Sequence, residues 1–98
     1  MEYEYRAEII SNQSVMDDII EQLENDISDV EYTIIENAQG KGISSKKLGN
    51  TVWPEMNFVL YAYVNLENAK KIKEIVENLK KKFPREGISC FFAKGEMI

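Results

Sequence analysis

The chain has 98 residues, with 17 acidic and 12 basic side chains that give a formal net charge of −5. This length fits one domain, residues 1–98, and the acidic balance argues against a nucleic-acid-binding surface. Because there is no histidine and one cysteine, the composition excludes Ser-His and Cys-His nucleophiles and zinc sites built from histidine and cysteine.

The first half of the chain shows a strand, a helix and a second strand. Tyr3 to Ile10 alternates apolar and polar residues, which predicts a strand with one polar face. Ser14, with Asp17 three residues later, resembles the capping box at a helix start. The helix is predicted from Val15 to Asn25 or Asp26. Val30 to Glu36 is rich in β-branched and aromatic residues and predicts the second strand.

The second half repeats this order. Met56 to Val64 predicts the third strand, and Asn65 can cap a second helix from Glu67 to Phe83. Ile88 to Ala93 predicts the fourth strand after a Pro-Gly turn. Two β-α-β halves in so short a chain predict a ferredoxin-like βαββαβ sandwich. This α+β fold has a four-stranded antiparallel sheet, two helices on one face and a long loop between strands two and three.

Two predicted strands are apolar on both faces. Every residue from Phe58 to Val64 is apolar or aromatic, and Ile88 to Ala93 is nearly as apolar. A two-layer sandwich covers one face of its sheet, and an exposed apolar patch of this size is uncommon on a soluble monomer. We therefore expect a homo-oligomer that packs sheet against sheet. The alternative is that the tyrosines lie flat at the surface, with their hydroxyls in water.

The segment 37–55, between the second and third strands, is longer than most such connections. It carries glycines and lysines at Gly40, Lys41, Gly42, Lys46 and Lys47. Glycine lets backbone N–H groups face an anion and lysine adds positive charge, which suits a phosphate or carboxylate ligand. The alternative is a solvated loop whose glycines only make turns.

Trp53 and Pro54 stand where this segment returns to the sheet. Proline restricts the backbone next to the single tryptophan of the chain. Trp53 is therefore expected either to anchor the base of the loop in a groove between subunits or to stack on a ligand.

The remaining residues form no catalytic constellation in the sequence. Asp17, Asp18, Glu21 and Glu24 are expected to lie on the solvated face of the first helix and not to form an acid–base pair. The nucleotide-hydrolase phosphate loop and the dinucleotide fingerprint are both missing. We expect no enzyme activity, no catalytic residue and no metal site, and the sequence identifies no cofactor.

The loop sequence resembles that of the PII-like regulatory proteins. The resemblance is carried by residues 34–42 and 49–57, of which Trp-Pro-Glu-Met-Asn at 53–57 is the most specific part. It implies a ferredoxin-like subunit, and a homotrimer whose sheets line the inside. It also implies a flexible loop between strands two and three, the T-loop, that contacts a partner protein. Small ligands, often adenine nucleotides, would sit in clefts between subunits near the base of that loop.

Carried over by position, the resemblance assigns residues to two groups. The expected ligand-binding residues are Gly40, Lys41, Gly42, Lys46, Lys47 and Gly87. The expected loop-base or oligomer contacts are Trp53, Pro54 and Asn57. The chain departs from PII proteins after the second helix, where residues 82–89 retain one glycine of the phosphate loop and have Ile88 where the lysine would stand. Nucleotide binding in the usual PII manner is therefore in question.

Two functions follow from these observations. The first is a PII-like signalling module: a homotrimer that binds a small anion and contacts a membrane transporter or an enzyme through the 37–55 loop. The alternative is a CutA-like trimeric assembly protein without nucleotide binding, in which the loop clasps a neighbour and buries Trp53. We expect a cytoplasmic protein without membrane insertion, because the sequence shows no export signal and no apolar run of the required length.

Overall fold

The computed structural model describes residues 4–43 and 46–98. The elements follow in the order β1 (Tyr5–Asn12), a 3₁₀ turn η1 (Gln13–Val15), α1 (Met16–Asp26), β2 (Tyr32–Ala38), β3 (Gly40–Lys41), β4 (Lys46–Lys47), β5 (Asn57–Val64), α2 (Leu66–Lys82) and β6 (Ser89–Lys94). Tyr3, the predicted start of the first strand, lies outside the described residues.

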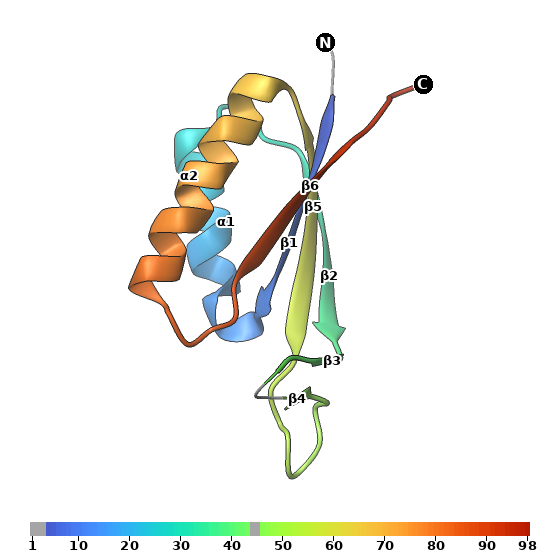
Figure 1. Ribbon diagram of the computed structural model, residues 1–98, viewed down its shortest axis with the longest axis vertical. Coiled ribbons are helices and arrows are strands. Elements are labelled where there is room, and N and C mark those ends of the chain that lie inside the picture. Colours follow the sequence, from blue (N-terminus) through green and yellow to red (C-terminus); the bar gives the residue numbers. More distant parts are fainter. Residues whose placement is uncertain (1–3, 44–45) are drawn as a thin grey trace.

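Four of the strands form one antiparallel sheet in the order β2-β5-β1-β6. Both helices lie on the same face of this sheet (Figure 1). The ferredoxin-like fold predicted from the two β-α-β halves is therefore confirmed. In the part of the chain that the structure describes, no helix is long and apolar enough to cross a membrane.

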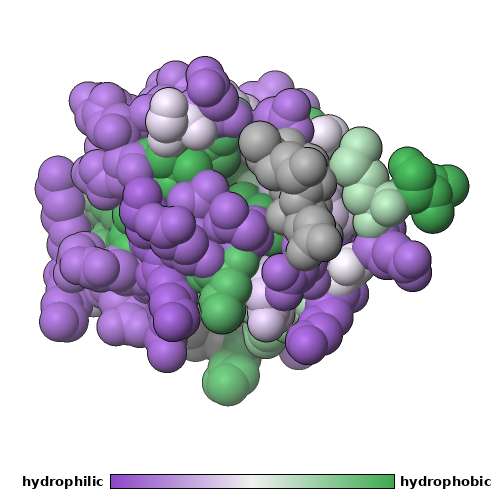
Figure 2. Space-filling model, turned by 90° about the horizontal axis from the view of Figure 1, so that it is seen from above, coloured by the Kyte–Doolittle hydropathy of each residue, from purple (hydrophilic) through white to green (hydrophobic). Residues whose placement is uncertain are grey.

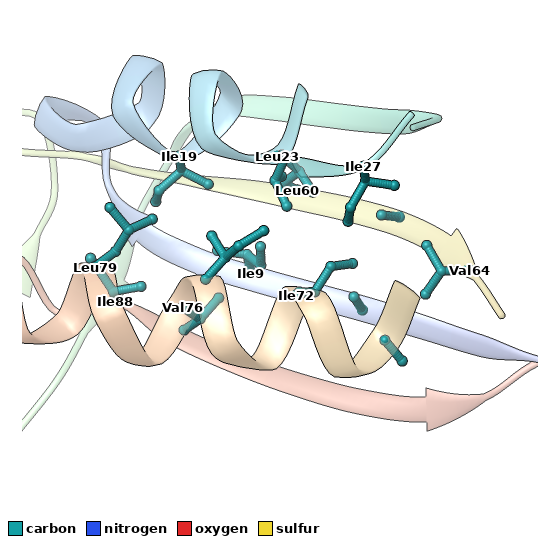
Figure 3. Packing of buried hydrophobic residues seen from close by; sticks show 14 of the residues in the cluster. Ile9, Ile19, Leu23, Ile27, Leu60, Val64, Ile72, Val76, Leu79 and Ile88 are labelled. Carbon is teal, nitrogen blue, oxygen red and sulfur yellow. The ribbon is translucent and has the colours of Figure 1, made fainter. Parts of the chain in front are cut away.

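The core lies between the sheet and the two helices. Alternate residues of the central strands point into it: Ile9 of β1 pairs with Leu60 of β5, and neither exposes any surface. Ile19 of α1 and Ile72 of α2 meet them from the helical layer and are equally buried (Figure 3). Burying one such aliphatic side chain stabilises the fold by roughly 1.5–3 kcal/mol.

The two helices begin differently. Asn65 caps α2 as predicted, since its Oδ1 accepts a hydrogen bond from the backbone N–H of Asn68 at 2.9 Å. The predicted capping box at α1 is wrong. Ser14 lies within the η1 turn, and its hydroxyl donates to Glu86 Oε2 at 2.6 Å. The N-cap of α1 is Val15, which has no side-chain cap.

The second face of the sheet carries large apolar side chains, as the pattern of the strands predicted. Ile35 is 52% exposed, Tyr63 is 50% exposed and Phe91 is 61% exposed. The helical layer, at the left in Figure 2, presents mostly hydrophilic side chains with apolar ones showing in patches between them. The two sides of the molecule therefore differ in character, and the side without helices is the one that requires a cover.

The segment between β2 and β5 contains more regular structure than a simple loop. β2 continues to Ala38, so the predicted loop start at Asn37 is too early. Residues 40–41 and 46–47 then pair as a small two-stranded sheet. The rest of the segment projects beyond the end of the main sheet (Figure 1), and the molecule measures 46 × 29 × 21 Å along its principal axes.

Candidate functional site

A cavity of about 410 Å³ lies at the end of the main sheet where the 37–55 loop leaves it. Ile10, Val59 and Ser89 contribute to its lining. They form one row across the sheet face opposite the helices, because Ile10 of β1 pairs with Val59 of β5 and with Ser89 of β6. The cavity therefore opens on the same side of the sheet as the exposed apolar residues.

One wall of the cavity comes from the start of the loop. It is lined by Ala38, Gln39, Gly40, Lys41 and Gly42, together with Lys47 from β4. Gly40 passes close to Asn57 at the beginning of β5, and a Cβ atom at position 40 would lie 2.8 Å from Asn57 Nδ2. Glycine is required there by the close approach of two chain segments, since a contact this short would force Asn57 to move.

The facing wall comes from the turn between α2 and β6, through Glu86 and Gly87. Gly87 has a φ of 61°, in the left-handed region that glycine adopts without strain. The backbone N–H of Asn12 donates to the Glu86 carbonyl at 3.2 Å. The turn is thereby fixed against the end of β1.

Asn12 links the two walls through its side chain. Its residue is 6% exposed, and its Nδ2 donates to Glu86 Oε2 at 2.7 Å and to Glu55 Oε2 at 3.1 Å. Glu55 also forms an ion pair with Lys47. A continuous set of polar contacts therefore runs from Glu86 through Asn12 and Glu55 to Lys47.

These contacts keep Glu86 ionised. The pKa of its carboxyl is lowered, first by the hydrogen bond from Ser14, then by that from Asn12, with a smaller contribution from the positive charge of Lys47. Partial burial acts in the opposite direction but is outweighed. The cavity thus contains both positive and negative groups, with Lys41 and Lys47 on the loop side and Glu86 on the other.

The structure brings together residues that the sequence assigned separately. Five of the six expected ligand-binding residues line this cavity, namely Gly40, Lys41, Gly42, Lys47 and Gly87, and Asn57 from the second group joins them. Lys46 is exposed and is not among the lining residues.

Trp53 and Pro54 lie farther along the loop. The Asn50 N–H donates to the Trp53 carbonyl at 3.0 Å, and Asn50 Oδ1 accepts from the Trp53 N–H at 2.7 Å. These bonds close a turn at residues 50–53, which leaves Trp53 37% exposed in the single subunit. Trp53 therefore belongs to the projecting part of the loop, at a turn that the Asn50 side chain stabilises.

Sequence reasoning missed the polar residues that support the cavity. Asn12 had no assigned role, Ser14 was taken as a helix cap, Glu55 as the end of the loop, and Glu86 as part of a helix stop. A signal was available for Glu55 and Asn57, since both belong to the Trp-Pro-Glu-Met-Asn stretch. Asn12 and Glu86 are separated by 74 positions in the chain, so no local pattern connects them.

Other reactive groups do not extend the chemistry of this cavity. Within residues 4–43 and 46–98, no three His, Cys, Asp or Glu side chains lie close enough together to hold a metal ion. Cys90, on β6, has a thiol whose pKa is raised to about 11, mainly by burial and further by the charge of Glu8. That thiol is protonated at neutral pH and is a poor nucleophile.

Comparisons with known proteins show the fold. No protein-family model and no curated protein sequence matches the chain. The structure of CPII, a nitrogen regulatory PII-like protein from Thiomonas intermedia K12 bound to ADP, AMP and bicarbonate, matches with a TM-score of 0.75 and 18% identity. That match covers 97% of this chain and 92% of CPII.

A second CPII structure, bound to ADP and bicarbonate, matches with a TM-score of 0.73 and 20% identity over 96% of this chain and 87% of CPII. A PII-like signalling protein from Thermus thermophilus gives 0.71 and 17% over 97% and 89% of the two chains. The chain therefore has the fold of PII-like proteins, as its loop sequence predicted.

Proposed function

We propose that the chain is a PII-like regulatory protein that binds a small anionic ligand in the cavity at the base of the 37–55 loop. The observation that carries this proposal is convergence. Residues assigned to the ligand from two distant segments, 40–47 and Gly87, line one cavity of about 410 Å³. The same fold binds ADP, AMP and bicarbonate in CPII, and this similarity supports a ligand of that kind here.

The lining suits an anion of limited charge. Lys41 and Lys47 supply positive charge, and the backbone at Gly40 and Gly42 is not screened by side chains. The glycine-rich phosphate loop of PII proteins is missing, and Glu86 occupies part of the corresponding turn. Bicarbonate, phosphate and a nucleoside monophosphate therefore fit the cavity better than a triphosphate.

The assembly that fits this proposal is a homotrimer formed through the open sheet face. Ile35, Tyr63 and Phe91 supply the apolar surface, and the cavity opens toward the same side. A neighbouring subunit packed there would complete the cavity wall. The loop beyond residue 47 would remain free to contact a transporter or an enzyme in the cytoplasm, so the role is regulatory and not catalytic.

The experiment combines the solution mass with ligand titration. Light scattering should give three times the chain mass of 11.3 kDa. Calorimetric titration with bicarbonate, AMP and ADP should show saturable binding of at least one of them, with one site per chain. A monomer without any ligand binding would refute the proposal.

The CutA-like alternative has one observation in its favour. Lys47 is already paired with Glu55, so part of the positive charge in the cavity is neutralised without a ligand. On this alternative, the protein is a trimer that binds none of the three ligands. Trp53 would then be buried by a neighbouring subunit and its fluorescence would be insensitive to a soluble quencher.

A further inference from the structure

We propose that Glu86 is a specificity-determining residue, which admits anions that carry a hydrogen-bond donor and rejects anions of the same shape and charge that carry none. This inference rests on the proposed function, because it concerns the ligand of the same cavity. It narrows the ligand class to protonated oxyanions, such as bicarbonate and hydrogen phosphate, or to an anionic group with a hydroxyl beside it.

The first step is the fixed position of the Glu86 carboxylate. Oε2 accepts a hydrogen bond from Asn12 Nδ2 at 2.7 Å and from the Ser14 hydroxyl at 2.6 Å. Asn12 is itself buried and bound to Glu55. In the described part of the chain, no hydrogen bond occupies Oε1, the other carboxylate oxygen. Glu86 therefore offers an oriented acceptor beside the cavity that it lines.

The second step is the protonation state of this group. An ionised carboxylate accepts hydrogen bonds and has none to donate. The two donors on Oε2 and the nearby charge of Lys47 all favour the ionised form, and the pKa of Glu86 is lowered accordingly. An anion that approaches Oε1 without a proton of its own therefore meets repulsion between two acceptors.

The third step is the charge balance. The cavity lining contributes Lys41, Lys47 and Glu86, and Glu55 is paired with Lys47. Two positive charges thus stand against two negative ones. Net attraction for a bare anion is weak in such a site, so a hydrogen bond donated to Glu86 decides which anion binds. A site built to receive a donor discriminates against the analogue that lacks it, because its acceptor is left unpaired.

The test uses two pairs of anions that differ in a single proton. Bicarbonate and nitrate are both planar and singly charged, whereas hydrogen phosphate and sulfate are both tetrahedral and, at mildly alkaline pH, doubly charged. Calorimetric titration of the wild-type protein should give affinities at least about tenfold higher for bicarbonate and hydrogen phosphate than for their partners. This comparison requires no variant and therefore does not depend on how any substitution folds.

A variant tests whether Glu86 is the source of the discrimination. Glu86→Gln replaces an acceptor with a group that can also donate. It should bind nitrate and sulfate more tightly than the wild type and reduce both affinity ratios to within about threefold. The control is Glu36→Gln, an exposed position of β2 outside the cavity lining, which should leave both ratios unchanged.

The outcomes separate this inference from the proposed function. Equal affinity of the wild type for both members of a pair, or unchanged ratios in Glu86→Gln, would overturn the inference and leave the ligand site in place. Binding of AMP or ADP without binding of any free oxyanion would do the same. Binding of none of these ligands would overturn the inference and the proposed function together.

Discussion

The side-chain amide of Asn12 lies 2.7 Å from Glu86 Oε2 and ties the end of β1 to the turn between α2 and β6. The same amide nitrogen reaches Glu55 at the return of the loop. One buried side chain therefore holds three segments that surround the candidate ligand cavity. Its loss should affect both the stability of the fold and the shape of the cavity.

Asn12→Ala should lower the free energy of unfolding by about 1–3 kcal/mol, because it removes a buried donor shared by two carboxylates. Urea unfolding followed by circular dichroism measures the change. Asn78→Ala, at an exposed position of α2, is the control and should not destabilise the protein. An Asn12→Ala variant as stable as the wild type would show that Asn12 does not hold these segments together.

The lowered pKa of Glu86 predicts the pH dependence of stability. A carboxyl whose pKa is lower in the folded chain stabilises it fully above the ordinary pKa of 4.5, and that contribution is lost as the pH falls through the lowered value. Glu86→Gln should therefore reduce the melting temperature at neutral pH. It should also lose less on acidification to about pH 3 than the wild type does.

The control for this experiment is again Glu36→Gln, whose melting curve should follow that of the wild type at both pH values. If the wild type and Glu86→Gln lose the same amount of stability on acidification, the hydrogen bonds from Ser14 and Asn12 do not favour the ionised carboxylate.

The close approach of Gly40 to Asn57 predicts a pairwise effect. Gly40→Ala places a Cβ atom 2.8 Å from Asn57 Nδ2 and should cost about 1–2 kcal/mol through overpacking. In an Asn57→Ala background the same substitution should cost less than half as much, because the clashing atoms are gone. A double-mutant cycle by urea unfolding measures this coupling. Additive effects would place the two segments farther apart than the structure does.

The open sheet face predicts the consequence of a charge introduced on it. Phe91→Glu, at a side chain 61% exposed on β6, should shift the protein toward the monomer, since a charge would be buried between subunits. Leu66→Glu, at a side chain 47% exposed at the start of α2, is the matched control. It should leave the mass from light scattering unchanged. If both variants keep the mass of the wild type, the subunits associate through another surface.

The fold could be predicted because its signals are local. Residues alternate along β1 and β5 and recur at helical spacing in α2, and Asn65 stands directly before the helix that it caps. The wrong cap at Ser14 has a tertiary cause. The carboxylate of Glu86 takes the hydroxyl that a helix N-terminus would otherwise use. A capping pattern contains no information about a competing group so distant in the chain.

The candidate site could be predicted in part. The glycines and lysines of the loop stand out in the sequence, and the resemblance added Gly87 from the other side of the cavity. The Asn12 contacts could not be found, since they join element ends that are 43 and 74 positions apart. The position of Trp53 depends on a turn closed by Asn50, so its closeness to β5 in sequence misplaced it.

The most direct test of the ligand site compares two adjacent lysines by calorimetric titration with bicarbonate, AMP and ADP. Lys47 lines the cavity, whereas Lys46 does not. We predict that Lys47→Ala weakens binding by about tenfold, corresponding to the loss of one charged contact, while Lys46→Ala stays within about twofold of the wild type. Equal losses in both variants, or no loss in Lys47→Ala, would contradict a ligand site in this cavity.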